Sequence, residues 1–322
     1  MRKALQAVLA LALLAPLAVT AQGYPNRPVK IINPFTPGGP IDLIARELIN
    51  GWSKALGQTF VLESKPGASG GLAISYVAHA APDGYTLLIG SAANITVPAL
   101  STKPPFDGIK EFSPVVLAIF VPNIMTVGPH VRATNVQQYI ELAKAKPGRL
   151  SFGSAGHGGS THIAGEIFQQ EAKVKLTHVP YKGAAPVIND MLGGHVDTAF
   201  LNLSAVLPHI KSGRLRALGV ASNARSKMVP DVPTFAELGV QHFFSGSWYG
   251  VLAPAGTPPE IVHALYTASA NHLLQPEVRL RIEESGAEVF LLDPPKLLAF
   301  MLEQKRDLVK IIKATGITKI DQ

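Results

Sequence analysis

The sequence predicts an α/β protein of two domains, each a mostly parallel sheet flanked by helices. Short apolar segments rich in β-branched residues alternate with amphipathic helical segments along most of the chain. Glycine-rich turns follow two of these predicted strands, and 322 residues are enough for about two domains. A composition of 47% hydrophobic and 16% charged residues excludes a largely disordered chain. The absence of cysteine excludes disulfides, thiolate metal sites, cysteine nucleophiles and lipid attachment to a cysteine.

Residues 1–21 have the features of a secretory signal peptide. Arg2 and Lys3 precede the apolar run Ala7–Val19, and small residues lead to a cleavage point after Ala21. An uncleaved membrane anchor is the alternative, but the run is shorter than the ~20 residues of a spanning helix. We therefore expect export with cleavage after about Ala21, which lowers the formal net charge from +7 to +5 because Arg2 and Lys3 are lost.

The order of the predicted elements follows from periodicity and turn signals. The expected strands are Val29–Asn33, Phe60–Glu63, Thr86–Ile89, Leu150–Phe152, Leu176–Val179, Val196–Phe200 and Leu215–Val220. The expected helices are 41–56, Thr161–Glu171, Ala184–Leu192, Leu203–Ser212, a helix ending near Leu274 and a last helix from Asp293-Pro294 to about Gly316. Capping boxes are predicted at Thr234–Glu237 and Thr257–Glu260. The stretches Phe120–Pro129 and Ser245–Pro254 are expected to be two crossings between domains.

Two glycine-rich turns, each between a strand and a helix, predict an anion site. They are Pro37-Gly38-Gly39 and the loop Gly153–Ser160. Glycine lets successive N–H groups point into one concavity, and the helix N-terminus behind it adds unpaired donors and partial positive charge. Ser154, Ser160 and Thr161 add hydroxyl donors in the second loop. The alternative is that both glycine turns only connect a strand to a helix.

Known motifs restrict the chemistry of this site. No Walker loop is present, and Thr161 replaces the last glycine of a dinucleotide fingerprint at Gly156–Thr161. A carboxylate is therefore the leading candidate anion. The scattered lysines and arginines, without interleaved aromatic residues, do not indicate nucleic-acid binding. His157, His162 and Glu166 lack the spacing of a metal site, so we expect no metal and no cofactor.

Several other residues are candidates to line a cleft, because ligands of parallel sheets bind beyond the carboxyl ends of strands. Asp42 either organises the first glycine loop or only starts its helix, and His162 either contacts the ligand or fixes the second loop. Lys182 either attracts the anion or is an exposed lysine without a role. The remaining candidates follow predicted strands and are Ser91, Ala92, Asn94, Tyr181 and Asn202.

These motifs resemble the tripartite tricarboxylate transporter solute-binding receptors, also called Bug receptors, over essentially the whole mature chain. The matching segments are 24–28, 34–46, 65–71, 82–88, 156–162, 178–183 and 248–258. The resemblance implies a type II-like periplasmic-binding-protein fold whose domains close on a small carboxylate held between two loops. It places Phe35, Thr36, Gly38, Gly39 and Asp42 in one loop, and residues from Ser154 to His162, including Gly156 and Gly158, in the other.

The resemblance also implies the domain organisation, location and partners. Domain 1 would comprise residues 22–123 and 247–322, and domain 2 residues 124–246. The protein would be a periplasmic monomer that is not an enzyme and that delivers its ligand to membrane permease subunits. Because Asn202 is uncharged, a di- or tricarboxylate or an aromatic carboxylate is favoured over an acidic amino acid. The alternatives are a ligand-presenting sensor and a periplasmic hydrolase that uses Ser160 and His162.

Overall fold

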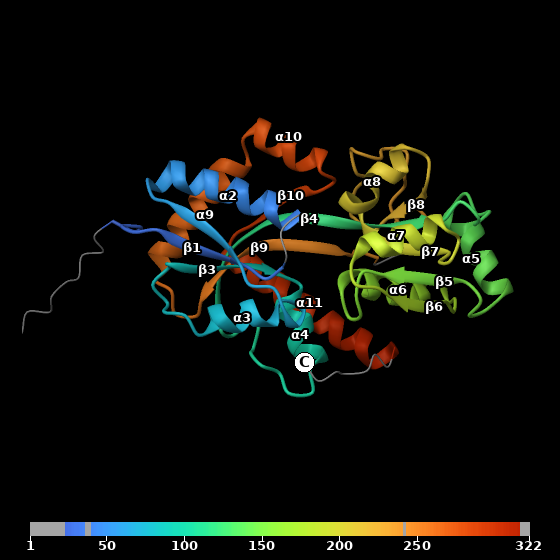
Figure 1. The fold of residues 1–322 in the computed structure, drawn as a ribbon, viewed down its shortest axis with the longest axis horizontal. Coiled ribbons are helices and arrows are strands. Elements are labelled where there is room, and N and C mark those ends of the chain that lie inside the picture. The colour runs from blue at the N-terminus through green and yellow to red at the C-terminus, as the bar shows by residue number, and fades with distance from the viewer. Residues whose placement is uncertain (1–22, 36–39, 241–242, 316–322) are drawn as a thin grey trace, which may run out of the picture.

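The computed structural model describes residues 23–35, 40–240 and 243–315, so the predicted signal peptide lies outside the described residues. Two groups of helices and strands lie along the long axis of the molecule (Figure 1). Strands β4 (Phe112–Val127) and β9 (Gly246–Pro254) run between the two groups. Within the described ranges, no helix combines the length and the apolarity that a membrane span requires.

The first group, here called the terminal lobe, is built from both ends of the described chain. Before β4 it contains β1 (Val29–Asn33), α2 (Pro40–Leu56), β2 (Phe60–Ser64), the 3-10 turn η1 (Ala68–Gly70), α3 (Gly71–Ala78), β3 (Thr86–Ser91) and α4 (Ala93–Leu100). After β9 it contains α9 (Pro259–Leu273), α10 (Pro276–Glu284), β10 (Glu288–Leu292) and α11 (Pro294–Thr315).

The terminal lobe encloses a sheet with the strand order β2-β1-β3-β9-β4. The first three strands are parallel, whereas β9 runs antiparallel to both of its neighbours and β10 pairs antiparallel with β4. Consecutive strand residues point to opposite faces. Ile31 therefore packs in one core with α2, α9 and α10, and Ile32 packs in the other with α3, α4 and α11. Helices thus cover both faces of the sheet (Figure 1).

The second group, here called the central lobe, follows β4. It contains α5 (Val136–Ala145), β5 (Ser151–Ser154), α6 (Ser160–Ala172), β6 (Thr177–Pro180), α7 (Ala184–Leu192), β7 (Thr198–Asn202), α8 (Leu203–Lys211) and β8 (Arg216–Val220). The end of β4 continues the sheet into the order β4-β7-β5-β6, and β8 pairs with β4. Met125 packs with α5 and α6, and its neighbour Ile124 packs with α7 and α8 on the other face.

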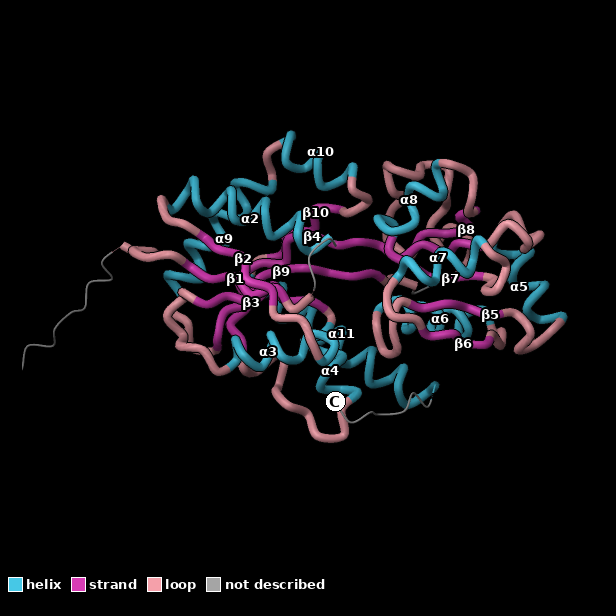
Figure 2. Tube along the Cα trace, in the orientation of Figure 1, coloured by secondary structure: helices cyan, strands magenta, loops and turns pink. Residues whose placement is uncertain are grey.

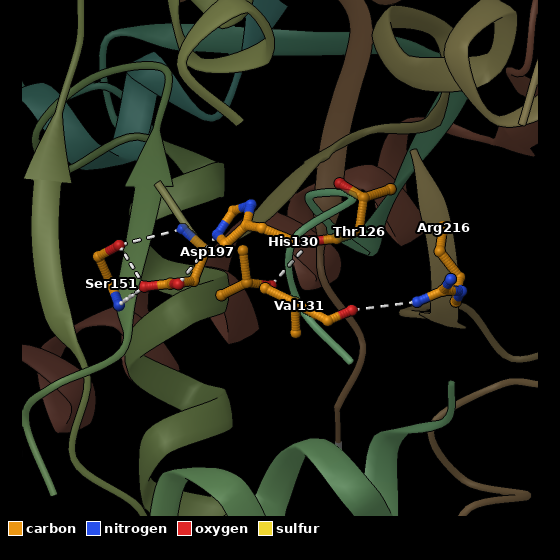
Figure 3. A network of polar contacts seen from close by, with 7 residues as sticks. Thr126, His130, Val131, Ser151, Asp197 and Arg216 are labelled. Carbon is orange, nitrogen blue, oxygen red and sulfur yellow. Dashed lines mark hydrogen bonds and ion pairs between the residues drawn. The ribbon is translucent and has the colours of Figure 1, made fainter. Parts of the chain in front are cut away.

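A polar network around Asp197 joins several strand ends of the central lobe (Figure 3). One carboxylate oxygen of Asp197 accepts hydrogen bonds from the Ser151 N–H and hydroxyl at 2.7 and 2.8 Å. The other lies 3.1 Å from Nε2 of His130, just beyond β4. Arg216, at the start of β8, donates to the carbonyl of Val131 at 3.2 Å. The network therefore joins the ends of β4, β5, β7 and β8.

Strands β4 and β9 connect the lobes as continuous strands (Figure 2). β4 pairs with β9 over residues 112–122, and with β7 and β8 over residues 123–127. Beside this change, the Asn123 N–H donates to the Ser245 carbonyl at 2.9 Å, and the Ser245 N–H donates to the Ala221 carbonyl at 3.0 Å. The strand partners change at these positions, and we keep the division into residues 22–123 with 247–322 and residues 124–246 as a proposal.

The α/β fold class is confirmed, and most predicted elements are present with small shifts at their ends. The Thr234–Glu237 box forms both of its reciprocal hydrogen bonds, at 2.7 and 3.2 Å, but around a turn rather than an α-helix. The box predicted at Thr257 is wrong, because Pro258 precedes α9 and the Thr257 hydroxyl donates to the Pro254 carbonyl at 2.8 Å. The two expected crossings belong to the long strands β4 and β9.

Candidate functional site

A cavity of about 340 Å³, here called the anion cavity, lies between the lobes at the carboxyl ends of four strands, the parallel pair β1 and β3 and the parallel pair β5 and β7. Phe35 follows β1, Ser91 ends β3, Ala155 follows β5 and Asn202 ends β7. The other lining residues are Ser69, Ala92, Ala93, Thr96, Val97, Leu100, Gly156, His157, Gly158, Gly159, Ser160, Thr161, Ser247 and Tyr249. Open α/β sheets bind their ligands at this position.

Two helices from different lobes begin at this cavity. α4 belongs to the terminal lobe, and Ala92, Ala93 and Thr96 of its first turn line the cavity. α6 belongs to the central lobe, and Ser160 and Thr161 of its first turn line the cavity from the other side. The first N–H groups of a helix have no partner within the helix and carry partial positive charge. The N-termini of both helices therefore lie at the same volume, and in α4 the Ala93 N–H already donates to the Ser91 hydroxyl at 3.3 Å.

The charge of the cavity comes from these backbone groups. Among the described residues, its lining includes no lysine, arginine, aspartate or glutamate. Burial raises the pKa of the Tyr249 phenol, which therefore stays protonated and contributes a hydroxyl. The site is thus suited to an anion that accepts several hydrogen bonds, without a cationic side chain to pair with it.

The loop before α6 is fixed by its own hydrogen bonds. Thr161 Oγ1 accepts the N–H of Ala155 at 2.9 Å, and His162 Nδ1 accepts the N–H of Gly158 at 3.0 Å. Gly158 has a φ of +73°, in the left-handed region that glycine adopts without steric cost. Because its N–H is taken by His162, Gly158 cannot donate that group to a ligand. The loop instead leaves the N–H groups of Ser160 and Thr161 directed away from the helix.

His162 lies below the loop in a stack of aromatic rings. It is 2% exposed, and its ring lies 3.9 Å from that of His178 at an angle of 10°. His178 also stacks on Phe152, and its Nε2 lies 2.7 Å from Ser154 Oγ. Burial and the neighbouring His162 lower the pKa of His178 to about 4, which keeps this imidazole neutral near pH 7. The stack thus supports the loop from beneath.

The same stack brings together three histidines whose nitrogens lie within 4.8 Å of one another, namely His157, His162 and His178. The sequence offered no third ligand near His157 and His162, and the pairing of β5 with β6 supplies His178. Lone pairs of imidazole lie in the ring plane, and the rings of His162 and His178 are nearly parallel. Two such rings do not aim at one ion, so we keep the prediction that no metal binds here.

A chain of polar side chains joins the loop to the crossing strands. Ser160 Oγ lies 3.1 Å from Ser247 Oγ, and the Ser247 hydroxyl donates to Asn202 Oδ1 at 3.0 Å. The Asn202 amide donates to Asn123 Oδ1 at 2.8 Å and to the Val121 carbonyl at 3.3 Å. A chain of hydrogen bonds thus connects side chains of β4, β7 and β9 to Ser160, the first residue of α6.

The turn η1 contributes a strained residue to the cavity. Ala68 and Ser69 have φ values of 46° and 55°, in the left-handed region that non-glycine residues adopt at an energetic cost. Ser69 lines the cavity. Strain of this kind persists where the surrounding structure fixes the backbone, and it is concentrated at functional sites. The glycine-rich sequence from Gly67 to Gly71 was the available signal for this turn.

The predicted site residues fall into three groups. Those that line the cavity are Phe35, Ser91, Ala92, Gly156, Gly158, Ser160, Thr161 and Asn202. Those that lie outside the described residues are Thr36, Gly38 and Gly39. Those that do not line the cavity are Asp42, Asn94, Ser154, His162 and Tyr181, because other groups in the fold engage them.

These five residues have supporting contacts instead. The Asn33 amide donates to Asp42 Oδ1 at 3.2 Å, and Asn33 Oδ1 in turn accepts the Phe35 N–H at 2.9 Å. Asn94 Oδ1 accepts the N–H of Ser91 at 3.2 Å. The Tyr181 hydroxyl donates to Asp190 at 2.5 Å. Sequence reasoning did not name Ser69, Thr96, Val97, Leu100, Ser247 and Tyr249 as ligand contacts, and it placed His157 in the second loop without assigning it a contact of its own.

Comparison with known proteins identifies the family. The sequence profile described as "Tripartite tricarboxylate transporter family receptor" matches residues 44–317. The chain belongs to this family. The resemblance seen in the sequence motifs is therefore confirmed, and so is the solute-binding character of the protein.

Proteins similar to this chain include two whose structures were solved with a carboxylate. Protein BugT of Bordetella pertussis is 35% identical over 301 residues, which cover 92% of each chain. An R. palustris protein solved with adipate is 34% identical, with a TM-score of 0.82, and the match covers 92% of this chain and 100% of that one. MatC from Rhodopseudomonas palustris, solved with bound malate, is 31% identical, with a TM-score of 0.76 and coverage of 90% and 100%.

Proposed function

We propose that this receptor captures a small carboxylate in the anion cavity within the periplasm and delivers it to the permease subunits of a tripartite tricarboxylate transporter. The observation that carries the proposal is the convergence of α4 and α6, one from each lobe, on a cavity lined by donors and by no charged side chain among the described residues. A carboxylate is the anion that this arrangement and the relatives' ligands favour.

Binding of this kind would bring the lobes together. Each hydrogen bond to a charged carboxylate contributes about 1.5–3 kcal/mol net, and micromolar affinity needs about 8 kcal/mol. Four or five such bonds therefore suffice after the cost of ordering. Because the donors come from both lobes, the ligand makes its full set of contacts only when the lobes are close, which favours a closed state.

The lining also restricts the ligand. A ligand with an amino group would need an acidic partner, and the described lining offers the uncharged Asn202 in that role. This supports a di- or tricarboxylate or an aromatic carboxylate over an acidic amino acid. A hydrolytic role for Ser160 has little support, because Ser160 Oγ contacts Ser247 while His162 contacts Gly158 and Glu166. We therefore propose binding without catalysis.

Calorimetric titration of the mature protein tests the proposal. The acids are malate, adipate, citrate, benzoate and glutamate, and the diamide of adipic acid serves as the uncharged control. We expect one site per chain with micromolar affinity for at least one carboxylate, and no binding of the diamide. Small-angle scattering should show compaction when the acid binds. Absence of binding by every acid, or equal binding of the diamide, would refute the carboxylate site, and unchanged cellular uptake after deletion of the gene would refute the delivery role.

A further inference from the structure

A second cavity, of about 520 Å³, lies on the other side of β9 from the anion cavity. The side chains of a strand alternate between its two faces. Ser247 and Tyr249 accordingly line the anion cavity, whereas Gly246 and Trp248 line the second one. The second cavity also lies between the lobes, because it is walled by α4 and α11 of the terminal lobe and by α6 of the central lobe. We call it the rear cavity.

The wall between the two cavities is thin and made of small side chains. Ala92, Thr96 and Ser160 line both cavities, so a single layer of side chains separates them there. This layer lies at an open edge of β9. β3 pairs with β9 as far as Tyr249, whereas β4 pairs with it as far as Gly246. On the side of β3, no strand of the described residues therefore lies beside the segment from Gly246 to Trp248, and the two cavities adjoin around this edge.

The lining of the rear cavity includes a cluster of apolar side chains and a set of polar ones. Ile163 and Ile167 of α6 face Phe120 and Phe244 of the crossing segments, whose rings stack at 4.5 Å. The polar side chains are Gln170 and Glu171 of α6 and, on the α11 side, Gln304 and the ion pair of Asp307 and Lys310. An apolar space with a few polar groups is the usual character of a site for an organic ligand.

Trp248, which lines this cavity, carries a buried donor without a partner. Trp248 is 1% exposed, and its indole N–H makes no hydrogen bond within the described part of the chain. A buried polar group without a partner is destabilising, and such groups are rare in folded proteins.

From these observations we infer that the ligand is a carboxylate with an apolar body, whose carboxylate occupies the anion cavity and whose body passes the edge of β9 into the rear cavity. The inference rests on the proposed function and adds the ligand class to it. The anion cavity supplies the hydrogen-bond donors for the carboxylate, and the rear cavity supplies apolar volume for the body. A four-carbon diacid would leave this volume unfilled. Ala92, Thr96 and Ser160 line both cavities, so the apolar body of the ligand passes between these residues, and it enters while the lobes are apart.

A homologous series of ω-phenyl alkanoates, from benzoate to 6-phenylhexanoate, tests the inference by calorimetry, with succinate as the short reference. Burial of each methylene contributes roughly a fourfold gain in affinity. We expect affinity to rise by about this factor per methylene once the chain is long enough to place the ring in the rear cavity. Equal affinity along the whole series, with the short acids bound, would overturn the inference.

Filling the rear cavity provides the matched test. Ile167→Phe and, separately, Ile163→Phe add volume to its wall, and Leu280→Phe makes the same kind of change at a residue that is 56% exposed on α10. We expect both filling variants to lose the gain of the long acids, at least tenfold, while succinate and benzoate bind as in the wild type. Leu280→Phe should bind the whole series unchanged.

The outcomes separate the two proposals. If short acids bind but the filling variants leave the long acids unaffected, the rear cavity does not hold the body and only this inference fails. If both filling variants weaken short and long acids equally, the inference also fails, because the effect then does not depend on the body. If no acid of any length binds to the wild-type protein, the proposed function itself fails.

Discussion

Gly158→Ala should weaken ligand binding because Gly158 and Leu100 meet across the anion cavity. Gly158 belongs to the central lobe and Leu100 to the terminal lobe. A Cβ atom at position 158 would lie 2.2 Å from Cδ1 of Leu100, whereas carbon atoms normally approach to about 3.5–4.0 Å. The added methyl group therefore requires the Leu100 side chain to move or the lobes to stay further apart.

The size of the effect follows from these two contributions. Overpacking of one methyl group costs about 1–3 kcal/mol. If this energy opposes closure, the Kd rises about 5- to 150-fold. In addition, the φ of +73° at Gly158 adds about 1–2 kcal/mol of strain to the folded state of an alanine variant. The first contribution acts on binding, and the second acts on stability.

A matched glycine separates the two contributions. Gly213 has a φ of +69°, and a Cβ there would meet no atom within 4 Å. Gly213→Ala should therefore lower the melting temperature about as much as Gly158→Ala, with no loss of affinity. Leu100→Ala removes the clashing methyl groups, so the double variant of Leu100→Ala and Gly158→Ala should bind like Leu100→Ala alone. Calorimetry and thermal unfolding of the wild type and the four variants measure both quantities.

Two results would refute this reasoning. If Gly158→Ala binds within twofold of the wild type, the two residues do not approach each other in the bound state. If the double variant remains as weak as Gly158→Ala, the loss arises from the backbone of the loop and not from contact with Leu100.

Three further predictions concern groups that support the fold and the site. Burial raises the pKa of Glu47, but hydrogen bonds and charge from Arg281 (2.9 and 3.0 Å) and from a neighbouring histidine outweigh it, so the folded pKa is lowered. The stabilisation that ionised Glu47 provides is therefore fully present at pH values above the ordinary glutamate pKa. It is lost as the pH falls through the lowered pKa of the folded state. Glu47→Gln should lower the free energy of unfolding at pH 7, measured by urea titration, by about 2–4 kcal/mol. The loss is smaller than for a fully buried ion pair because Arg281 is half exposed. A change under 1 kcal/mol would contradict this prediction. The folded pKa of His178, about 4, lies below its ordinary value of 6.5, so the unfolded chain binds more protons between these values and the protein loses stability as the pH falls across this window. His178→Gln should flatten that dependence in unfolding experiments at pH 5 and pH 7, and an equal slope would argue against a buried neutral imidazole. Thr161→Val removes the acceptor of the Ala155 N–H and should weaken carboxylate binding by about 1 kcal/mol, roughly fivefold; wild-type affinity would show that this bond does not hold the loop.

The sequence predicted local elements well and long-range pairing poorly. Val29–Asn33 and Ala184–Leu192 agree with β1 and α7 because turn and helix signals mark both ends of each. β4 was not recognised as a strand, since its 16 residues are apolar on both faces and show no alternation. Its many partners, including β9 from far along the chain, follow from tertiary contacts that local patterns do not encode.

The same distinction applies to the site. The loop before α6 was predicted from its glycines and hydroxyl residues, and its Ser160 and Thr161 line the cavity. Ser154 and His162 have equally suitable polar groups, but the fold engages them within a stack that depends on the pairing of β5 with β6. Ser247 was out of reach of sequence reasoning, because its direction depends on the alternation along β9.

The position of β9 determines when the terminal lobe can be completed during folding. β9 lies between β3 and β4, yet more than a hundred residues separate it from both along the chain, and the whole central lobe intervenes. Until residues 246–254 are available, β3 and β4 both present unpaired edges, which are templates for aggregation. The sheet of the central lobe is complete by residue 220. A chain that is synthesised from its N-terminus therefore completes the central lobe first. The exposed edges of β3 and β4 need protection until β9, in the last third of the chain, has been made.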